Sequence, residues 1–582
     1  MEVATRIVPT EQNPDLVTYN VLVEGKEISK NYHLTNITIH NEINKISTAN
    51  LVILDGETNE EKFAISDAGD FLPGKKIEVR FGYHNENKTV FKGIIVTNTH
   101  KVNDTCSEMQ VECKHEAIRM TVNKGNRHFN DVTDSDIATR LLDDNKISGT
   151  SVETLKEKHE QLVQSNVTDW DYMISRIDIN AMICVINNAQ LTLKKPNMKD
   201  DAKLELIYGA NILEFHADMD ARTQTAAVKT LSWDFANQKV VTTDSEDQGA
   251  PEGGEFKRDK LATVMDRPIE MRTSATLSQQ ETQAIANAKR LRQDLSKIKA
   301  KVKYQGVTKV LPGDFITISG AGKNFNGKAF VSAIQHEYGD GDWITEATLG
   351  WNEQFFSEQT NPTQGASATG HSSSIHGLQT GIVTGITDSN GQYRVKIRLP
   401  MVNDQDEGIY ARVATLDAGD KRGTFFRPEV DDEVVVGFMN DDASNPVILG
   451  MLHSSAKSAP LEPATANPEK GYVSRKGIRL IFNDDNPSVL IETPGSRVFE
   501  MNDKDNSITV KDKKGNKIVI DNGGILIDSV TDLKIKAGAS VSIEAPQVSL
   551  KADGAMSIEG TGSTGVSSSG ITEIKGSLVK IN

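Results

Sequence analysis

The sequence has few cysteines and few aromatic residues, and it lacks any long hydrophobic run. Three cysteines occur among 582 residues. Their number is odd and none forms a C-x-x-C pair, so a disulfide framework is not expected. No stretch approaches the roughly 20 apolar residues that span a bilayer. The start, MEVATRIVPTEQNPD, has no basic segment before an apolar run, so we predict synthesis in the cytoplasm without a signal peptide.

Basic residues are fewer than acidic ones, which gives a net charge of -16. A nucleic-acid-binding protein needs a basic face to displace counterions from phosphates, so the acidic net charge argues against this class. Hydrophobic residues make up 37% and charged residues 25% of the chain, which fits a series of folded domains. The length exceeds what one hydrophobic core organises and indicates about three to five domains.

Most of the chain shows the period-2 pattern of β-strands, with three helical exceptions. Within residues 15–125, apolar and polar residues alternate along short stretches, and Gly, Asn and Asp turns separate these stretches. Helical spacing appears at 131–144 and 166–178, and a strand pair is expected at 181–195. A longer helix with a charged outer face is predicted over 278–302. Cys106 and Cys113 lie in alternating sequence and are expected to be half-buried strand residues, not metal ligands.

Two segments, 71–102 and 310–338, resemble each other. Both contain Leu-Pro-Gly, a strand, a turn and Phe-x-Gly before a second strand. The matched residues are Pro73 and Gly74 with Pro312 and Gly313, and Phe91 and Gly93 with Phe325 and Gly327. The repeat predicts a duplicated β-barrel, although Pro-Gly turns are common and two unrelated hairpins would share them.

The C-terminal stretch DLKIKAGASVSIEAPQVSLKADGAMSIEG, 532–560, carries pairs of apolar residues spaced by one position. The pairs are Leu533/Ile535, Val541/Ile543, Val548/Leu550 and Met556/Ile558. From about residue 475 onward the pattern predicts short alternating strands almost throughout. Two small apolar side chains per strand cannot build a core, so a partner must cover them. A single-chain solenoid is one alternative, but its turns need more hydrophobic content.

Motifs for chemistry are weak. GKNFNGKA, 322–329, fits the phosphate-loop spacing, but Ala329 replaces the required hydroxyl and a strand pattern follows it. NDKDNS, 502–507, lacks the glycine and distant glutamate of a calcium loop, so a hairpin turn is expected. The remaining candidates are turn carboxylates and two linker histidines expected to be solvated and without an ordered acid partner: Asp431, Asp432, Asp441, Asp442, His371 and His376.

The segment from Gly377 to Ser455 resembles the OB-fold of the VgrG family, the spike proteins of contractile injection systems. The matching parts are the turn before RVKIRLP, then YARVATLDAG, FRPEVDDEVVVGF and NPVILG. Gly391 is expected at a positive-φ turn, and Val395, Ile397 and Leu399 are expected to point inward. Upstream, TDWDYMISRIDINAMICV resembles the family's hub, and RKGIRLIFNDDNPSVLIETPG resembles its entry into a β-helix. ANLVILDG, FLPGKKIEVRFGY and VECKHEAIRMTV look more like spikes of extracellular injection particles.

The resemblance implies a mainly β protein: a duplicated β-barrel hub with a small α/β insert, an OB-fold collar and a C-terminal intertwined trimeric β-helix. Three chains around one axis would cover the apolar pairs. The expected domains are a first barrel 1–130, a helix-strand insert 131–200, a second barrel with a helix 201–356, a linker 357–375, the OB-fold 376–455, a linker 456–471 and the β-helix needle 472–582.

The implied function is a structural spike and hub that caps an inner tube, punctures a target membrane and delivers cargo. Implied partners are two further copies of the chain, inner-tube and baseplate proteins, a PAAR-type tip protein at the C-terminal end, effector cargo and, transiently, the target membrane. No nucleic acid partner, cofactor, metal or catalytic residue is expected. The particle is expected to be released from the cell, with a cell-bound secretion apparatus as the alternative.

Two other functions remain open. A cell-wall-degrading tail enzyme would need a catalytic insert, yet only the short linker 454–471 follows the OB segment. A receptor-binding β-helix adhesin would be expected to offer aromatic residues for sugar stacking, but residues 500–582 contain no Trp, Tyr or Phe.

Overall fold

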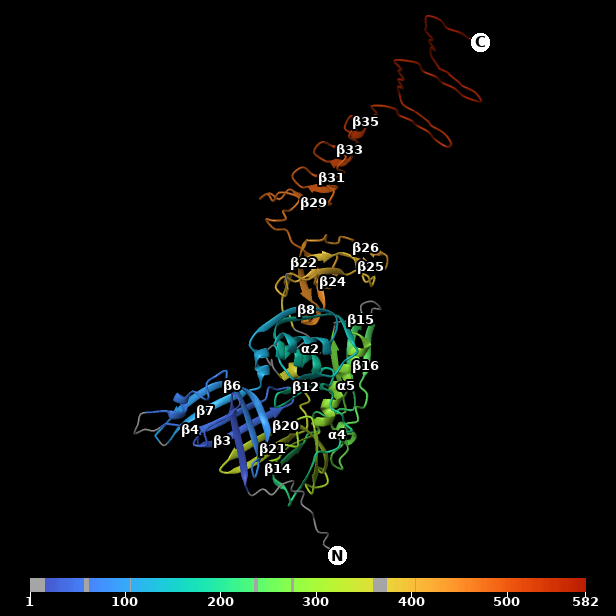
Figure 1. The fold of residues 1–582 in the computed structure, drawn as a ribbon. Coiled ribbons are helices and arrows are strands. Elements are labelled where there is room, and N and C mark those ends of the chain that lie inside the picture. Colours follow the sequence, from blue (N-terminus) through green and yellow to red (C-terminus); the bar gives the residue numbers. More distant parts are fainter. Residues whose placement is uncertain are drawn as a thin grey trace. The chain divides into compact units, whose positions relative to one another are not determined.

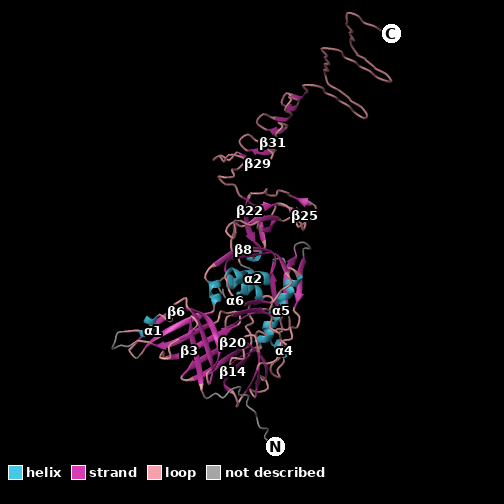
Figure 2. Ribbon diagram, in the orientation of Figure 1, coloured by secondary structure: helices cyan, strands magenta, loops and turns pink. Residues whose placement is uncertain are grey.

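The computed structural model describes residues 16–56, 62–104, 106–234, 239–273, 277–359, 374–403 and 405–581. The chain folds as two compact units, Met1–His453 and Ser454–Asn582. Strands dominate both units, and the helices drawn in Figure 2 belong to the first. The mainly β fold class is confirmed.

Thirteen strands of the first unit form one continuous sheet (Figure 1). Along its main path the order is β14-β18-β21-β20-β3-β4-β7-β6-β5-β1-β2, while β19 pairs with both β20 and β13. The strands are β1 (Val17–Val23), β2 (Lys26–Glu27), β3 (Leu34–Glu42), β4 (Thr48–Leu54), β5 (Lys76–Tyr83), β6 (Glu86–Val102), β7 (Ser107–Lys114), β13 (Leu204–Ile207), β14 (Ile212–Met219), β18 (Ile298–Gln305), β19 (Phe315–Ser319), β20 (Gly327–Gly339) and β21 (Asp342–Leu349).

Strands β3 and β20 join the two halves of this sheet. They pair antiparallel, with Ile39 opposite His336 and Asn41 opposite Ile334. The two barrels that the sequence predicts as separate therefore share one sheet. Each half keeps its own hydrophobic cluster, and Trp343 of β21 extends into the cluster of the first half.

The two repeated Pro-Gly turns have the same backbone geometry. Gly74 and Gly313 have φ of +95° and +93°. The Gly74 amide donates to the Ile95 carbonyl at 2.8 Å, and the Gly313 amide donates to the Val331 carbonyl at 2.8 Å. Both glycines thus fix the start of an equivalent hairpin, as their positive φ requires.

The second part of the predicted repeat is out of register. Gly93 lies opposite Ile77, three residues after the first turn, whereas Gly327 lies opposite Ile318, five residues after the second. The match of Phe91 and Gly93 with Phe325 and Gly327 is therefore wrong. The hairpin connections differ in length, because β6 follows β5 closely while a longer turn separates β19 from β20.

An α/β insert and a helical layer complete the hub. Thr133 caps α2 and shares a capping box with Asp136, so the helix begins at Asp134, inside the predicted helical segment 131–144. Small sheets pair β10 with β8, β12 with β11 and β9, and β15 with β16 and β17. The elements are α1 (Ala64–Ala68), the 3₁₀ helix η1 (Glu116–Thr121), β8 (Lys124–Thr133), α2 (Asp134–Asp144), β9 (Thr150–Val152), β10 (Lys158–Thr168), α3 (Asp169–Asp178), β11 (Ile183–Asn187), β12 (Gln190–Lys194), β15 (Val228–Asp234), β16 (Lys239–Asp244), α4 (Arg258–Met265), β17 (Ile269–Thr273), α5 (Gln279–Ser296) and α6 (Phe356–Gln359).

The long helix α5 differs from its prediction in length and in exposure. It begins after its cap, Ser278, and ends at Ser296, so the predicted end at 302 is wrong because β18 starts at Ile298. Its charged side is not solvated either. Lys289, Arg292 and Asp294 are all buried. Each has an ionic partner on another helix: Glu358 of α6, Asp178 of α3 and Arg258 of α4, respectively.

The OB segment closes into a five-stranded barrel, β22-β23-β24-β28-β27. Val395, Ile397 and Leu399 are buried in its core, as predicted. Gly391 has φ of +67° in the preceding turn, also as predicted. The elements are β22 (Gln379–Gly385), β23 (Val395–Arg398), β24 (Ile409–Val413), β25 (Ala418–Gly419), β26 (Arg422–Gly423), β27 (Glu433–Phe438), the 3₁₀ helix η2 (Met439–Asp441) and β28 (Pro446–Met451).

The second unit contains a seven-stranded antiparallel meander in chain order. Its strands are β29 (Glu469–Val473), β30 (Arg479–Asn483), β31 (Ser488–Glu492), β32 (Val498–Asn502), β33 (Ser507–Lys511), β34 (Lys517–Asp521) and β35 (Gly524–Asp528). Beyond β35, residues 530–581 are exposed, and residues 529–581 form no strand in the single chain. The strands predicted for a three-chain β-helix are therefore absent from this segment when the chain is alone. Short strands need neighbours, and this segment has none within its own chain.

Candidate assembly surfaces

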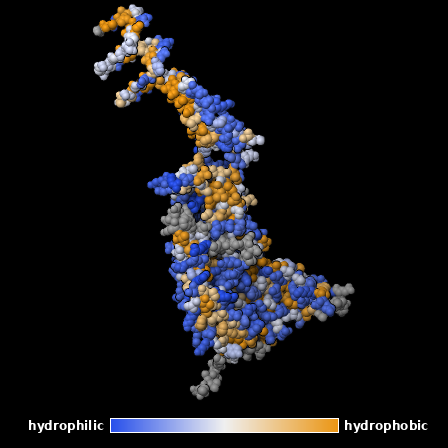
Figure 3. Space-filling model, turned by 180° about the vertical axis from the view of Figure 1, so that it is seen from behind, coloured by the Kyte–Doolittle hydropathy of each residue, from blue (hydrophilic) through white to orange (hydrophobic). Residues whose placement is uncertain are grey.

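One face of the second unit carries two parallel rows of apolar side chains, called here the apolar ladders. In register order they run Leu480, Ile491, Phe499, Val510, Ile518, Ile527 and Phe482, Val489, Met501, Ile508, Ile520, Ile525. The ladders arise because each of the strands β30 to β35 places two apolar residues one position apart, and strand side chains alternate between faces. Figure 3 shows the apolar residues gathered along one side of this sheet.

The ladders are uncovered in the single chain. Ile508, Val510, Ile518 and Ile520 are each about 40% exposed, from 39% to 43%. The intervening residues Thr509 and Val519 face the other way, and they are half-buried. A continuous apolar surface of this length is unusual on a monomeric protein and marks an interaction site.

The apolar pairs beyond β35 extend the same pattern. Leu533 and Ile535 are 58% and 70% exposed, and Met556 and Ile558 are 52% and 68% exposed. These residues have the spacing of buried strand residues, but in the single chain their side chains are exposed. This segment needs chains other than its own to become a folded β structure.

A second surface lies within the first unit, where the insert meets the OB barrel. The Gln161 side chain on β10 donates to the carbonyls of Tyr410 at 3.0 Å and Ser444 at 2.8 Å, and accepts from the Tyr410 amide at 2.6 Å. Val163, two residues along β10, is fully buried in the OB core. The insert and the OB barrel are thereby joined as neighbours in a single body.

Ion pairs border this joint. Arg394 of the OB barrel contacts Glu160 of β10 at 2.7 Å and Asp388 at 2.9 Å. Its hydrogen bonds are the first cause that lowers the pKa of Asp388 to about 2. On the other side, His128 Nδ1 lies 2.7 Å from Asp406 Oδ2. Hydrogen bonds to charged groups fix direction as well as distance, so they hold the OB barrel and the insert in one relative position.

A buried ionic cluster ties the insert to α5. Arg176 Nε donates to Asp134 Oδ1 at 2.6 Å, and His159 lies 3.1 Å from Asp134 and 2.8 Å from Glu281. Burial and Arg176 lower the pKa of His159, but its hydrogen bonds to Asp134 and Glu281 outweigh them and raise that pKa to about 8. Burial alone would raise the pKa of Asp134, yet Arg176 and His159 hold it well below its usual range.

The rejected nucleotide and calcium motifs lie in turns. Gly322 precedes a turn, and β20 begins at Gly327, so no helix follows GKNFNGKA. The NDKDNS stretch connects β32 to β33, where the Asn506 amide donates to the Asp503 carbonyl at 3.2 Å. The strand expected after GKNFNGKA and the hairpin turn expected at NDKDNS are both present.

The turn carboxylates and histidines follow the predictions in part. Asp431 has φ of +72° in the turn before β27, and Asp441 belongs to η2. His376 is partly solvated as predicted, but it lies 3.2 Å from Asp441, so the expectation that it lacks an ordered acid partner is wrong. His371 lies outside the described residues.

The cysteines are free thiols in three environments. Cys113 of β7 and Cys184 of β11 are buried, and burial raises the pKa of both thiols. Cys106 is exposed just before β7, so its predicted place in a strand is wrong. In the described ranges, no group of three His, Cys, Asp or Glu side chains is placed to hold a metal ion, and no helix is long and apolar enough to cross a bilayer.

Family models match three parts of the chain. Residues 13–340 match the model described as the Alg8 N-terminal domain. Residues 379–453 match the type VI secretion system/phage-baseplate injector OB domain, which coincides with the closed barrel. Residues 488–557 match the phage baseplate V C-terminal trimerisation domain, which includes most of the ladders and three of the four apolar pairs. No curated protein matches the sequence.

Three solved structures are similar to the chain at low sequence identity, and the first of them shares its fold. A chain of the Francisella PdpA–VgrG complex in its lidded form is 11% identical, covers 88% of this chain and 80% of its own, and has a TM-score of 0.52. The E. coli c3393 protein, a component of the type VI secretion system, is 11% identical and covers 74% of this chain and 99% of its own, with a TM-score of 0.48. The 43 kDa tail protein of prophage MuSo2 from Shewanella oneidensis is 13% identical and covers 58% of this chain and 99% of its own, with a TM-score of 0.45.

The first family model spans more than half of the sequence. The chain therefore belongs to the family described by the Alg8 N-terminal domain and, with its OB and trimerisation domains, is a VgrG-like structural spike protein.

Proposed function

We propose that three copies of this chain form the central spike and hub of a contractile injection system. The trimer caps the inner tube, punctures the target membrane and delivers cargo carried by partner proteins. A PAAR-type protein covers its C-terminal end, and the particle is released from the cell that makes it.

The uncovered apolar ladders support this proposal most directly. Burying half of one large apolar side chain stabilises an assembly by about 1 kcal/mol, and each chain offers twelve apolar side chains in two rows. Three ladder faces meeting along one axis would bury them together. The strand edges of a lone chain would otherwise promote aggregation.

The shared sheet of the hub suits a second role, docking on a tube and baseplate. Each chain carries two halves with matching Pro-Gly turns. Three chains would present about six similar faces, which would let a three-fold spike meet a six-fold tube. The joint between the insert and the OB barrel would then carry load from the hub toward the needle.

The proposal is tested by the mass of the full chain in dilute solution, measured by light scattering after gel filtration. We expect three times the chain mass of 63.7 kDa. The matched variants use two register pairs on the same strands. Ile508→Asp with Ile520→Asp alters the ladder face, and Thr509→Asp with Val519→Asp alters the opposite face.

The ladder variant should dissociate into monomers at a concentration where the wild type and the control remain trimers. A wild-type monomer at micromolar concentration would refute the shared needle. Equal dissociation of both variants would show that the ladders are not the trimer interface.

A further inference from the structure

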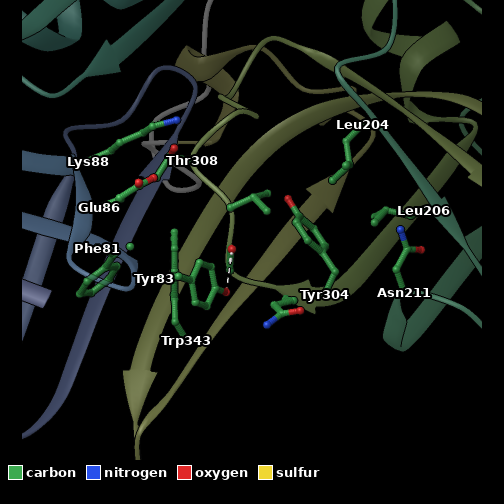
Figure 4. Close-up of a pocket in the computed structure, with 14 residues that line it drawn as sticks. Phe81, Tyr83, Glu86, Lys88, Leu204, Leu206, Asn211, Tyr304, Thr308 and Trp343 are labelled. Carbon is green, nitrogen blue, oxygen red and sulfur yellow. Dashed lines mark hydrogen bonds between the residues drawn. The ribbon is translucent and has the colours of Figure 1, made fainter. Parts of the chain in front are cut away.

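A cavity of about 300 Å³ lies at the seam between the two halves of the hub, apart from the assembly surfaces (Figure 4). One wall comes from the β5–β6 hairpin, including Phe81 and Tyr83. The other comes from β13, β18, the loop that follows β18, and Trp343 of β21. Its volume is at the lower end of the range for small-ligand sites.

The aromatic side of this cavity is held in place. Tyr83 donates its hydroxyl to the Gly306 carbonyl at 3.0 Å, and its ring lies 5.4 Å from that of Trp343. Gly306 packs directly on the indole, where an added Cβ would come within 2.0 Å of it. The cavity is therefore preformed by packing and does not depend on a mobile side chain.

Two of the residues that line the cavity, Tyr304 and Trp343, each carry a buried polar group without a partner. Tyr304 is 2% exposed and Trp343 is 3% exposed. Among the residues that the structure describes, neither the Tyr304 hydroxyl nor Trp343 Nε1 finds a hydrogen-bond partner. Figure 4 shows the Tyr304 hydroxyl directed toward the space between Leu204 and Thr308. An unpaired buried donor is unfavourable, so a ligand that accepts a hydrogen bond from it gains binding affinity.

The charges around the cavity decide what kind of acceptor fits. The charged residues in its described lining are Glu86 and Lys88, which are both exposed and opposite in sign. A carboxylate placed beside Tyr304 would be desolvated without a buried cation to balance it. A carbonyl oxygen accepts the same hydrogen bonds without that penalty, and the aromatic and aliphatic walls suit an apolar group beside it.

We propose that this cavity binds an uncharged amide that carries an aromatic or branched apolar group, with the Tyr304 hydroxyl donating to the amide carbonyl. The same chemistry is offered by a free small amide and by an apolar residue of a partner's peptide. The site needs neither trimer nor needle, so it stands or fails separately from the spike function.

The test uses the full chain and three probes followed by ligand-detected NMR titration: N-acetyl-phenylalaninamide, the acid N-acetyl-phenylalanine, and the blocked tripeptide N-acetyl-Ala-Phe-Ala-amide. We expect the amide to bind at least five-fold more tightly than the acid. A tripeptide that binds more tightly than the single amide indicates a peptide as the natural occupant, whereas equal affinities indicate a free amide.

The diagnostic variant is Tyr304→Phe, which removes the unpaired hydroxyl and keeps the ring. It should weaken amide binding about ten-fold while the melting temperature stays the same or rises, because no native hydrogen bond is lost. Tyr338→Phe, outside the cavity, is the matched control and should bind as the wild type does. No binding of either amide, or unchanged binding in Tyr304→Phe, would overturn the proposal.

Discussion

Val163 of the insert is part of the OB core, and its amide donates to Ser444 Oγ of that domain at 3.1 Å. The two residues are 281 positions apart in the sequence. A strand of one region thus completes the core of the next, so we infer that the OB barrel and the insert unfold together.

Val163→Ala should lower the free energy of unfolding by about 2 kcal/mol, since it removes apolar surface from a packed core. It should also separate the melting of the OB barrel from that of the hub. Calorimetry of the variant would show a new early transition. A single transition at a lower temperature would mean that the polar contacts of Gln161 are enough to keep the unfolding of the OB barrel coupled to that of the insert.

The stability of the hub should depend on pH through His159. Its pKa is about 8 in the folded protein and about 6.5 in an unfolded chain. Because the folded value is higher, its stabilisation is fully present below about pH 6.5 and is lost as pH rises through 8. The shift corresponds to about 2 kcal/mol.

Thermal denaturation between pH 6 and 9 measures this effect. The melting temperature should fall across that range in the wild type and much less in His159→Gln. The buried His336 has a pKa lowered to about 4, so its effect appears below pH 6.5 and has the opposite sign. Identical slopes in wild type and variant would contradict the assignment to His159.

Arg292 of α5 is the largest fully buried ionic side chain in the described hub. It pairs with Asp178 of α3, donates to the carbonyls of Asn352 at 2.9 Å and Gln354 at 2.8 Å, and stacks 4.1 Å from the Trp351 ring. Arg292→Leu should destabilise the hub by about 3–5 kcal/mol, because Asp178 would stay buried without its partner.

The double variant Arg292→Leu with Asp178→Leu tests that reason. Urea denaturation should show that the double variant loses less unfolding free energy than the two single variants lose in total, because no unpaired charge remains in it. Additive losses would show that packing against Trp351, and not the ion pair, dominates.

The sequence predicts the local structure of this protein better than its long-range contacts. Thr133 and Ser278 are visible as helix caps because their partners lie three residues away. The buried state of Arg292 is not visible, because a charge on a helix normally faces solvent and Asp178 lies 114 positions away. The ladders and apolar pairs are predictable from spacing, but what covers them is outside one chain.

Removal of the second unit should separate folding from assembly. A chain ending at His453 keeps every strand of the hub and the OB barrel, so we expect a cooperative melting transition close to that of the full chain. The truncated chain should be monomeric at micromolar concentration, or its trimer should dissociate at a much higher concentration than that of the full chain, because the ladders are gone. Sedimentation velocity would decide this, and an equally stable trimer would place the main trimer contacts in the first unit.

The two matched turns offer a comparison of backbone strain with packing. Gly74 and Gly313 share nearly the same positive φ, so replacing either with Ala should cost about 1 kcal/mol from conformation alone. An added Cβ at Gly74 meets nothing within 4 Å, whereas one at Gly313 meets Ile183 Cδ1 at 2.8 Å. Gly313→Ala should therefore lower the melting temperature more than Gly74→Ala. Adding Ile183→Val to Gly313→Ala should recover part of the difference, because it shortens the opposing side chain. Equal losses in the two single variants would mean that Ile183 moves aside without cost and that the turns differ in sequence context only.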